Sequence, residues 1–403
     1  MERLQNARVL IYSHDSFGLG HLRRCRAIAH ALVDRFKGVS VLILSGSPII
    51  GSFDFRPRVD FVRIPGVIKL HNGEYQSLGL HIALDQTMDM RAAIIRQTAL
   101  SFRPDLFLVD KEPLGLQGEA LATLKMLKAK GTTLVVGLRD IMDDPSALLR
   151  EWQRKRAIPA LEHFYDEIWV YGLESFADPL EGVECPWDIR RKVIYTGYLR
   201  RTVPRLPTSP TIPIDAEPYV LVTVGGGDDG MALVDWVLSA YEHDPAIPLA
   251  AVIVMGPFMP LEMQRRFRAR AQRLERIAMV TFDAHVELLM ERAVGVVAMA
   301  GYNTFCEILS LDKRAILVPR TAPRREQVMR ARRAAELELA RMLDPVSVRA
   351  PQTMGEALRG LLRQPLPSER GADEMLNGLP LITGRIASHV GGVKPMPARA
   401  AGI

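Results

Sequence analysis

The stretch SHDSFGLGHLRRCRAIAHAL, residues 13–32, decides the fold of the first half of the chain and raises the question of its function. It follows the strand-like run RVLIYS, and apolar residues then recur at helical spacing, at Leu22, Ile28, Ala29, Leu32 and Phe36. We therefore predict a strand, a glycine turn and a helix that begins near Gly20 or His21. A dinucleotide-binding turn would read Gly-x-Gly-x-x-Gly, but this chain has Arg23 where the third glycine belongs. The stretch indicates a ligand other than NAD.

Short apolar runs alternate with amphipathic helical stretches along the whole chain, which is the pattern of α/β proteins. In the first half the predicted strands are RVLIYS, VSVLILS, VDFVRI, DLFLVD, TTLVVGL, EIWVYG and KVIYTG. In the second half they are YVLVTVGG, AAVIVMG, AMVTF, GVVAMA and AILVP. Several of these runs are apolar throughout, as expected where helices cover both faces of a parallel sheet. We predict two doubly wound, Rossmann-like domains facing a central cleft.

The boundary between the domains is predicted by the segment RRTVPRLPTSPTIPIDAEP, whose prolines at positions 204, 207, 210, 213 and 218 suit neither a helix nor a central strand. We expect a first domain over residues 1–200, a linker over 201–218 and a second domain over 219–370. A helical segment over 371–390 and a disordered tail over 391–403 complete the prediction. In open α/β sheets ligands bind beyond the carboxyl ends of the strands, so function should lie in the loops after strands.

Composition excludes several classes of protein. With 24% charged and 48% hydrophobic residues in 403, the chain has the make-up of a packed globular protein. We expect no signal peptide, no bilayer-spanning helix and a cytoplasmic location. The three cysteines, at positions 25, 185 and 306, form no Cys-x-x-Cys pair, so neither a disulfide framework nor a zinc site is indicated. The net charge of +6 favours an anionic partner, although a spread excess also suits a solubilising surface.

The first loop offers a candidate general base. A histidine at the start of a helix meets the positive end of the macrodipole, which disfavours imidazolium. His21 should therefore stay neutral near pH 7, as a general base must. The alternative is a histidine that only satisfies a hydrogen bond of its loop.

Two loops of the second half suit a phosphate-bearing ligand. Gly225, Gly226 and Gly227 end a strand, and their backbone N–H groups can approach phosphate oxygens, although a plain tight turn explains them equally well. In AGYNTFCE, Thr304 and Glu307 share one helix face and also read as a capping box. Such a threonine can meet phosphate, and such a carboxylate can accept hydrogen bonds from a ribose.

A basic helix follows in LVPRTAPRREQVMRARRAAEL. Arg324 and Arg325 lie near its N-terminus, where an anionic ligand or acidic neighbours would offset the unfavourable macrodipole. The later arginines, Arg330, Arg332 and Arg333, read as a solvated basic face. Glu326 and Gln327 carry short hydrogen-bonding groups suited to sugar hydroxyls.

In this order the motifs resemble those of the GT-B glycosyltransferases, particularly the MurG-type family, which transfers N-acetylglucosamine from a UDP-sugar. GLGH is similar to the family's first glycine loop, GGGDDG to its second, and AGYNTFCE to its ribose and phosphate segment. The resemblance implies donor contacts by Gly225, Gly226, Gly227, Phe282, Gly301, Thr304, Glu307, Glu326 and Gln327, with Arg201 or its rival Arg200 after the TGYLRR strand end. Asp228 and Asp229 depart from the family, since two carboxylates would repel a diphosphate unless they turn away. Glu326 replaces a glutamine, which leaves the donor sugar open.

The resemblance implies an inverting glycosyltransferase that uses no metal or other cofactor, with His21 as its base. Its donor would be a nucleotide-diphosphate sugar with UDP as the nucleotide. The domain over residues 219–370 would bind this donor, and the domain over residues 1–200 would be on the acceptor side. The acceptor is unknown, and residues at first-half strand ends are candidates to shape its pocket or to replace His21: His14, Asp110, Glu112, Arg139 and Asp140. GHLRRC also resembles the first loop of PseG-type UDP-sugar hydrolases, in which water would replace the acceptor. A nucleotide-sugar-binding protein without catalysis is a third reading. Residues 63–84 mix basic and apolar side chains and suit either a membrane surface or an acceptor lid, whereas no motif supports nucleic-acid binding.

Overall fold

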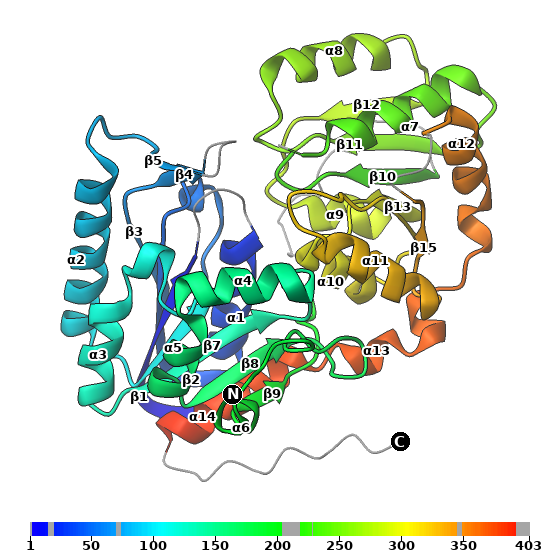
Figure 1. The fold of residues 1–403 in the computed structure, drawn as a ribbon. Coiled ribbons are helices and arrows are strands. Elements are labelled where there is room, and N and C mark those ends of the chain that lie inside the picture. The colour runs from blue at the N-terminus through cyan, green and yellow to red at the C-terminus, as the bar shows by residue number, and fades with distance from the viewer. Residues whose placement is uncertain are drawn as a thin grey trace. The chain divides into compact units, whose positions relative to one another are not determined.

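The computed structural model describes residues 2–14, 20–69, 74–203, 218–227, 229–344 and 349–391. The chain forms two compact units (Figure 1). Unit 1 comprises Met1–Leu199 together with Asn377–Ile403, and unit 2 comprises Arg200–Leu376. Most of the predicted linker, residues 204–217, and the predicted tail beyond residue 391 lie outside the described residues, as does Asp228.

Unit 1 is built on a seven-stranded parallel sheet in the order β3-β2-β1-β6-β7-β8-β9. Its strands are β1 (Glu2–Ser13), β2 (Phe36–Ser45), β3 (Val59–Arg63), β6 (Leu106–Asp110), β7 (Thr133–Arg139), β8 (Glu167–Tyr171) and β9 (Val193–Tyr195). A small antiparallel hairpin pairs β4 (Val67–Lys69) with β5 (Tyr75–Ser77). Its helices are α1 (Gly20–Arg35), α2 (Leu84–Phe102), α3 (Leu121–Ala129), α4 (Pro145–Lys155), α5 (Ala157–Phe164), α6 (Trp187–Arg190) and α14 (Gly378–Val390).

Unit 2 is built on a six-stranded parallel sheet in the order β12-β11-β10-β13-β14-β15. Its strands are β10 (Tyr219–Thr223), β11 (Ala250–Val254), β12 (Ile277–Val280), β13 (Gly295–Ala298), β14 (Ala315–Leu317) and β15 (Arg341–Met342). Its helices are α7 (Met231–His243), α8 (Leu261–Ala271), α9 (Val286–Arg292), α10 (Tyr302–Ser310), α11 (Glu326–Glu336), α12 (Pro351–Gly360) and α13 (Ala372–Met375). The predicted α/β class with two Rossmann-like parallel sheets is confirmed.

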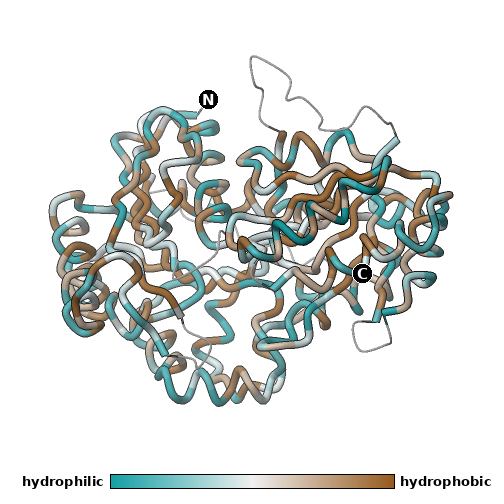
Figure 2. Tube along the Cα trace, turned by 90° about the horizontal axis from the view of Figure 1, so that it is seen from above, coloured by the Kyte–Doolittle hydropathy of each residue, from teal (hydrophilic) through white to brown (hydrophobic). Residues whose placement is uncertain are grey.

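Helices cover both faces of the unit 1 sheet. Helices α2, α3 and α5 pack together as one layer and α1 packs with α14 as the other, with the sheet between them (Figure 1). Strands β6 and β8 are consequently buried at every residue, which explains why they read as continuous apolar runs. Figure 2 shows apolar segments, in brown, through the interior of each unit and polar segments, in teal, mainly around them.

The strand order places a topological switch point in each unit. In unit 1 the chain leaves β1 for β2 on one side and later returns to pair β6 on the other. In unit 2 the chain leaves β10 for β11 on one side and later returns to pair β13 with β10 on the other. At a switch point the two loops after the central strands diverge and leave a crevice where ligands of such sheets bind. The first-loop histidine and the second-half glycine loop both follow switch-point strands.

The last helix of the chain belongs to unit 1. Helix α14 packs against α1, and its Arg385 and His389 both reach the Glu167 carboxylate at the start of β8. Nε of Arg385 donates to Oε2 over 3.0 Å, Nε2 of His389 lies 2.8 Å from Oε1, and the indole of Trp169 donates to Oε2 over 2.7 Å. Burial alone would raise the pKa of Glu167, but these three partners lower it to about 2. None of the described helices is long and apolar enough to cross a bilayer.

We predict that Glu167→Gln loosens α14 and lowers the free energy of unfolding at pH 7 by about 1–3 kcal/mol, because buried donors lose a charged acceptor. A carboxylate with a depressed pKa stabilises the fold above its ordinary value near 4.5, and that contribution is lost as the pH falls toward 2. The difference from wild type should therefore shrink on acidification. Urea unfolding at pH 7, 5 and 3.5, with the exposed Glu162→Gln as control, measures it. A difference that is constant with pH would contradict the assignment.

Candidate functional site

The switch point of unit 1 brings three charged or ionisable side chains into direct contact. Asp110 ends β6, and His21 and Arg24 lie one turn apart on α1, which follows β1. Nδ1 of His21 lies 2.5 Å from Oδ2 of Asp110. The Arg24 guanidinium donates to both oxygens of the same carboxylate, through Nε over 2.8 Å and Nη2 over 2.6 Å. The three side chains form one cluster, which we call the His21 cluster.

Burial and charge together set the protonation of this cluster. Asp110 has no exposed surface, and burial would raise its pKa, but Arg24 and His21 hold that pKa well below its usual range. Burial also lowers the pKa of His21; Asp110 opposes this shift, and Arg24 and Lys111 reinforce it. The helix begins at Gly20, so His21 lies in its first turn as predicted. The lowered pKa favours the neutral imidazole that we expected from the macrodipole, and burial is the largest cause of this shift.

The contact with Asp110 also fixes the tautomer of His21. An ionised carboxylate only accepts hydrogen bonds, so Nδ1 carries the proton and donates it to Asp110. The remaining nitrogen, Nε2, then has a free lone pair, and the side chain keeps 18% of its surface exposed. Asp110 has no such access. Within the cluster, His21 is the side chain that can accept a proton from a ligand, and Asp110 orients it.

A second group of side chains lies beside the His21 cluster. The His14 ring stands edge-on to the His21 ring with centroids 5.4 Å apart. Burial lowers the pKa of His14 well below its ordinary value, and its buried Nδ1 has no hydrogen-bond partner among the described residues. Glu112 is held by Lys155 over 2.8 Å, and Lys111 lies 3.4 Å from the same carboxylate. Of the two, His14 has a polar atom left to receive a ligand, whereas Glu112 is part of an ion-pair network.

The other two acceptor-side candidates end β7. Arg139 is partly exposed, and the fully buried Asp140 accepts a hydrogen bond of 2.8 Å from the Tyr198 hydroxyl. Asp140 thus ties the end of β7 to the segment that follows β9. Sequence reasoning missed Arg24, although its position three residues after His21 places both on one helix face and could have indicated it.

In unit 2 the glycine loop after β10 is explained by close backbone packing. Gly225 and Gly227 have φ values of 64° and 96°. A Cβ on Gly227 would lie 2.2 Å from the Met255 carbonyl oxygen, and Phe258 N donates to Gly226 O over 2.9 Å. The loop therefore packs on the loop after β11. A Cβ on Gly225 would meet nothing within 4 Å, so that side of the loop is open to a ligand.

Helix α10 follows the other switch-point strand of unit 2, but its cap differs from the prediction. The N-cap is Gly301, with no side-chain cap hydrogen bond, so the capping box of Thr304 and Glu307 is wrong. Thr304 is the third helical residue and partly exposed, whereas Glu307 is only 1% exposed. A Cβ on Gly301 would meet nothing within 4 Å. The space beside Gly301 is therefore open among the described residues, and Glu307 is buried one turn further along the helix.

The structure separates the two rival arginines. Nη2 of Arg201 donates to Oδ1 of Asn303 in the first turn of α10 over 2.7 Å. Arg200 instead pairs with Asp373 over 2.7 Å, and both side chains are exposed. Arg201 is therefore the arginine whose side chain reaches the first turn of α10, while its backbone N–H donates to Ser310 Oγ at the other end of that helix. Phe282 is half-buried in the loop after β12.

The basic helix α11 does not present one solvated face. Arg330 is completely buried, donates to Ala300 O over 2.8 Å and lies with its guanidinium carbon 5.9 Å from the Tyr302 ring centroid. The prediction of a solvated position is wrong for Arg330, because helical periodicity turns it inward beneath the α10 N-terminus. Arg332 is exposed and Arg333 pairs with Glu336 on the outer face, as expected.

The predicted sugar-reading pair lies at the start of α11. Glu326 is 2% exposed and accepts a hydrogen bond of 2.7 Å from Nη2 of Arg320. Gln327 is 7% exposed and accepts one of 3.2 Å from the backbone of Arg320. The other arm of Arg320 pairs with Asp229. Asp229 thus turns toward an arginine, and sequence reasoning missed that partner. No group of three metal-ligating side chains occurs in the described ranges.

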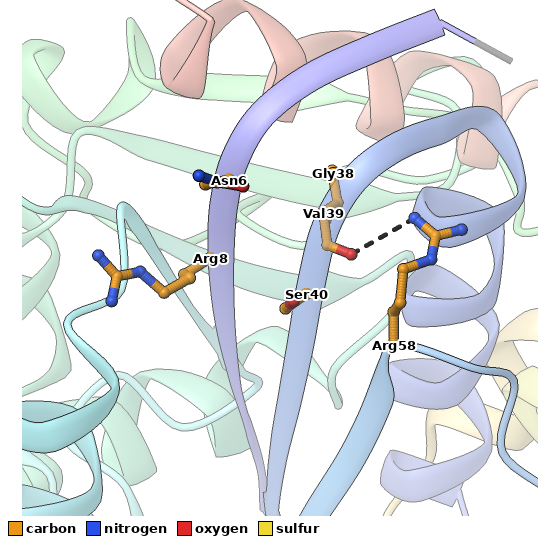
Figure 3. Close-up of a pocket in the computed structure, with 6 residues that line it drawn as sticks. All are labelled: Asn6, Arg8, Gly38, Val39, Ser40 and Arg58. Atoms are coloured by element: carbon orange, nitrogen blue, oxygen red, sulfur yellow. Dashed lines mark hydrogen bonds between the residues drawn. The ribbon is translucent and has the colours of Figure 1, made fainter.

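A hollow of about 370 Å³ lies elsewhere in unit 1, near the starts of β1 and β2 rather than at the switch point. Figure 3 shows its lining residues, with Arg8 directed away from Arg58 and Arg58 donating to Val39 O over 3.5 Å. Arg58 also donates to Phe36 O over 2.7 Å and to Val33 O over 2.5 Å, and the Val33 carbonyl belongs to the last turn of α1. The arginines do not converge, so this hollow does not compete with the His21 cluster as a site.

The family model described as glycosyltransferase family 28 C-terminal domain matches residues 219–383. The fold is similar to that of the glycotransferase of kitacinnamycin, with a TM-score of 0.62, 15% identity and coverage of 98% of this chain and 100% of the other. It is also similar to Acinetobacter baumannii MurG (TM-score 0.54, 13% identity, coverage 97% and 100%). A Listeria monocytogenes protein assigned as a UDP-N-acetylglucosamine 2-epimerase has a TM-score of 0.60, 12% identity and coverage of 98% and 99%. Comparison with the sequences of curated proteins gives no match.

We predict that Arg330→Gln destabilises the protein by about 1–3 kcal/mol, because the buried Ala300 carbonyl loses its charged donor. The matched variant Arg332→Gln, on the exposed face of the same helix, should change stability by no more than about 0.5 kcal/mol. Denaturant unfolding of the two variants measures the difference. Equal effects would show that Arg330 contributes no more than a surface arginine.

Proposed function

We propose that the chain is an inverting glycosyltransferase of the GT-B type, whose residues 219–383 match the family 28 C-terminal domain. It transfers a sugar from a nucleotide-diphosphate sugar, with UDP as the nucleotide, to a hydroxyl acceptor. The observation that carries this proposal is the His21 cluster, in which a neutral, partly exposed imidazole is oriented by a buried carboxylate. Fold similarity alone supports less, because the same fold also occurs in a protein assigned as an epimerase.

In the proposed reaction Nε2 of His21 takes the proton of the acceptor hydroxyl as its oxygen attacks the anomeric carbon. The bond from that carbon to the diphosphate oxygen breaks on the opposite face, so the configuration inverts. Asp110 stabilises the imidazolium that forms through the hydrogen bond to Nδ1. His14, with its buried Nδ1 available, is the candidate to bind the acceptor beside the base.

Unit 2 is proposed to hold the donor at its switch point. Backbone N–H groups beside Gly225 and Gly301 are proposed to bind the diphosphate, and the side chain of Arg201 adds positive charge in the first turn of α10. Such preorganised donors stabilise the negative charge that develops on the leaving diphosphate. Gly226, Gly227, Phe282, Gly301 and Thr304 complete the proposed contacts, and ribose binding by Glu307 requires that its buried carboxylate be reached from the α10 turn. Glu326 and Gln327 are proposed to bind the donor sugar.

A panel of nucleotide sugars tests the proposed donor. We expect UDP-sugars to raise the melting temperature, since a ligand at one hundred times its dissociation constant adds about 2.7 kcal/mol to stability. Donor incubated without acceptor should release sugar slowly. Rapid acceptor-free release would instead establish a UDP-sugar hydrolase, and tight binding without turnover on any acceptor would establish a binding protein. Contact with a membrane surface through residues 63–84 stays a prediction; Leu80 and Ile82 in that segment are 45% and 37% exposed.

We predict that His21→Ala lowers turnover by about two to four orders of magnitude while the affinity for UDP stays within about twofold. His30→Ala, on the same helix, serves as control. Because the pKa of His21 lies below its ordinary 6.5, kcat/KM should stay flat down to pH 6.5 and fall only at lower pH. Steady-state kinetics from pH 5 to 8 measures both effects. A His21→Ala variant with normal turnover would remove His21 from the mechanism.

A further inference from the structure

One arginine joins three loops of unit 2 that carry proposed donor residues. Arg320 follows β14, and its guanidinium pairs with Asp229 of the glycine loop through Nη1 and with Glu326 through Nη2 over 2.7 Å. Its backbone N–H donates to Oε1 of Gln327 over 3.2 Å. The segment after β10, the segment after β14 and the first turn of α11 are therefore held together by a single residue.

The charges of this network need the arginine. Asp229 and Glu326 have the same charge and would repel each other and a nearby diphosphate. Burial lowers the pKa of Arg320, but Glu326 and Asp229 raise it by more, so the guanidinium stays charged. The Arg320 side chain is 25% exposed and Glu326 only 2%, so water screens their attraction less than at a surface. Arg320 thus neutralises Asp229 and Glu326, two acidic residues at which the chain departs from the family pattern.

The same contacts decide what the sugar-reading pair can offer. Glu326 lies in the first turn of α11, where the helix dipole favours a carboxylate, and Arg320 holds one of its oxygens. Gln327 uses its carbonyl oxygen on the backbone of Arg320, which leaves its NH2 group as the remaining donor. Both side chains are nearly buried, so contacts within the protein orient them. The guanidinium of Arg320 is such a contact for Glu326, and the backbone N–H of Arg320 is one for Gln327.

We propose that Arg320 is a positioning residue for recognition of the donor sugar by Glu326 and Gln327, and that its side chain acts through Glu326. This inference rests on the proposed function, in which that pair binds the sugar. The proposed nucleotide contacts come from the glycine loop and the α10 N-terminus. Loss of Arg320 also removes the partner of Asp229 beside the glycine loop, so it weakens binding of the nucleotide slightly and binding of the sugar portion much more.

The test compares UDP with UDP-N-acetylglucosamine and UDP-glucose as ligands of the full chain. In Arg320→Gln we expect the dissociation constant for UDP to change by less than about twofold, and that of the sugar nucleotide preferred by wild type to rise about tenfold. Arg320→Lys keeps the positive charge but cannot donate to two carboxylates through a planar guanidinium. Its dissociation constant for the sugar nucleotide should therefore lie between those of wild type and Arg320→Gln. Arg333→Gln breaks the Arg333–Glu336 pair on the same helix and should leave all three constants unchanged.

A double variant separates positioning from a general structural effect. If Arg320 acts through Glu326, then Arg320→Gln adds little further loss once Glu326→Gln is present. A fully additive loss, or an Arg320→Gln variant that binds UDP and the sugar nucleotides equally less well or equally as well as wild type, overturns the inference alone. A wild-type chain that binds none of the three ligands overturns the proposed function and the inference with it.

Discussion

The buried carboxylate of Asp110 is the constraint on which the unit 1 site depends. Removal of an ionised group from water costs several kcal/mol, which only close partners of opposite charge can offset. Arg24 supplies two charge-assisted hydrogen bonds and His21 a third, so all of the partners are on α1. The helix must begin at Gly20 for both side chains to face the end of β6. The fold therefore fixes the imidazole before any ligand arrives.

Unit 2 also has buried charges with close partners at its switch point, but there the central groups are cations rather than an anion. Arg330 is a wholly buried cation whose partners include the carbonyl of Ala300, directly before the α10 cap. Arg320 is a partly buried cation between two carboxylates. In both units the strands around the switch point are apolar and the charged side chains gather at their carboxyl ends. Charge is thus concentrated where the sheet topology opens a crevice, and the glycines allow the backbone to approach it.

Much of the fold was predictable because it depends on periodicities that each segment carries within itself. Continuous apolar runs indicated parallel strands covered on both faces, and the start of α1 followed from the spacing around His21. The contacts that define the sites join residues far apart in sequence, such as Arg24 with Asp110 and Arg320 with Asp229, and no local pattern encodes them. Thr-x-x-Glu was wrong as a capping box because the N-cap of α10 is Gly301, three residues before Thr304. The prediction of a solvated position was wrong for Arg330. A charged side chain indicates exposure in a sequence, but the helical phase of Arg330 turns it toward the interior.

The arginine in the His21 cluster also decides what kind of base the cluster makes. A carboxylate paired only with imidazole raises the basicity of that ring and stabilises its protonated form. In this chain Arg24 draws on the same carboxylate and adds its own positive charge near the ring, so both effects work against protonation. Asp110 is left to fix the tautomer and direction of His21 more than to strengthen it. His21 is thus oriented by Asp110 while its pKa lies below its ordinary value. Such a ring suits the proposed reaction, in which the acceptor proton is released only as the bond to the sugar forms.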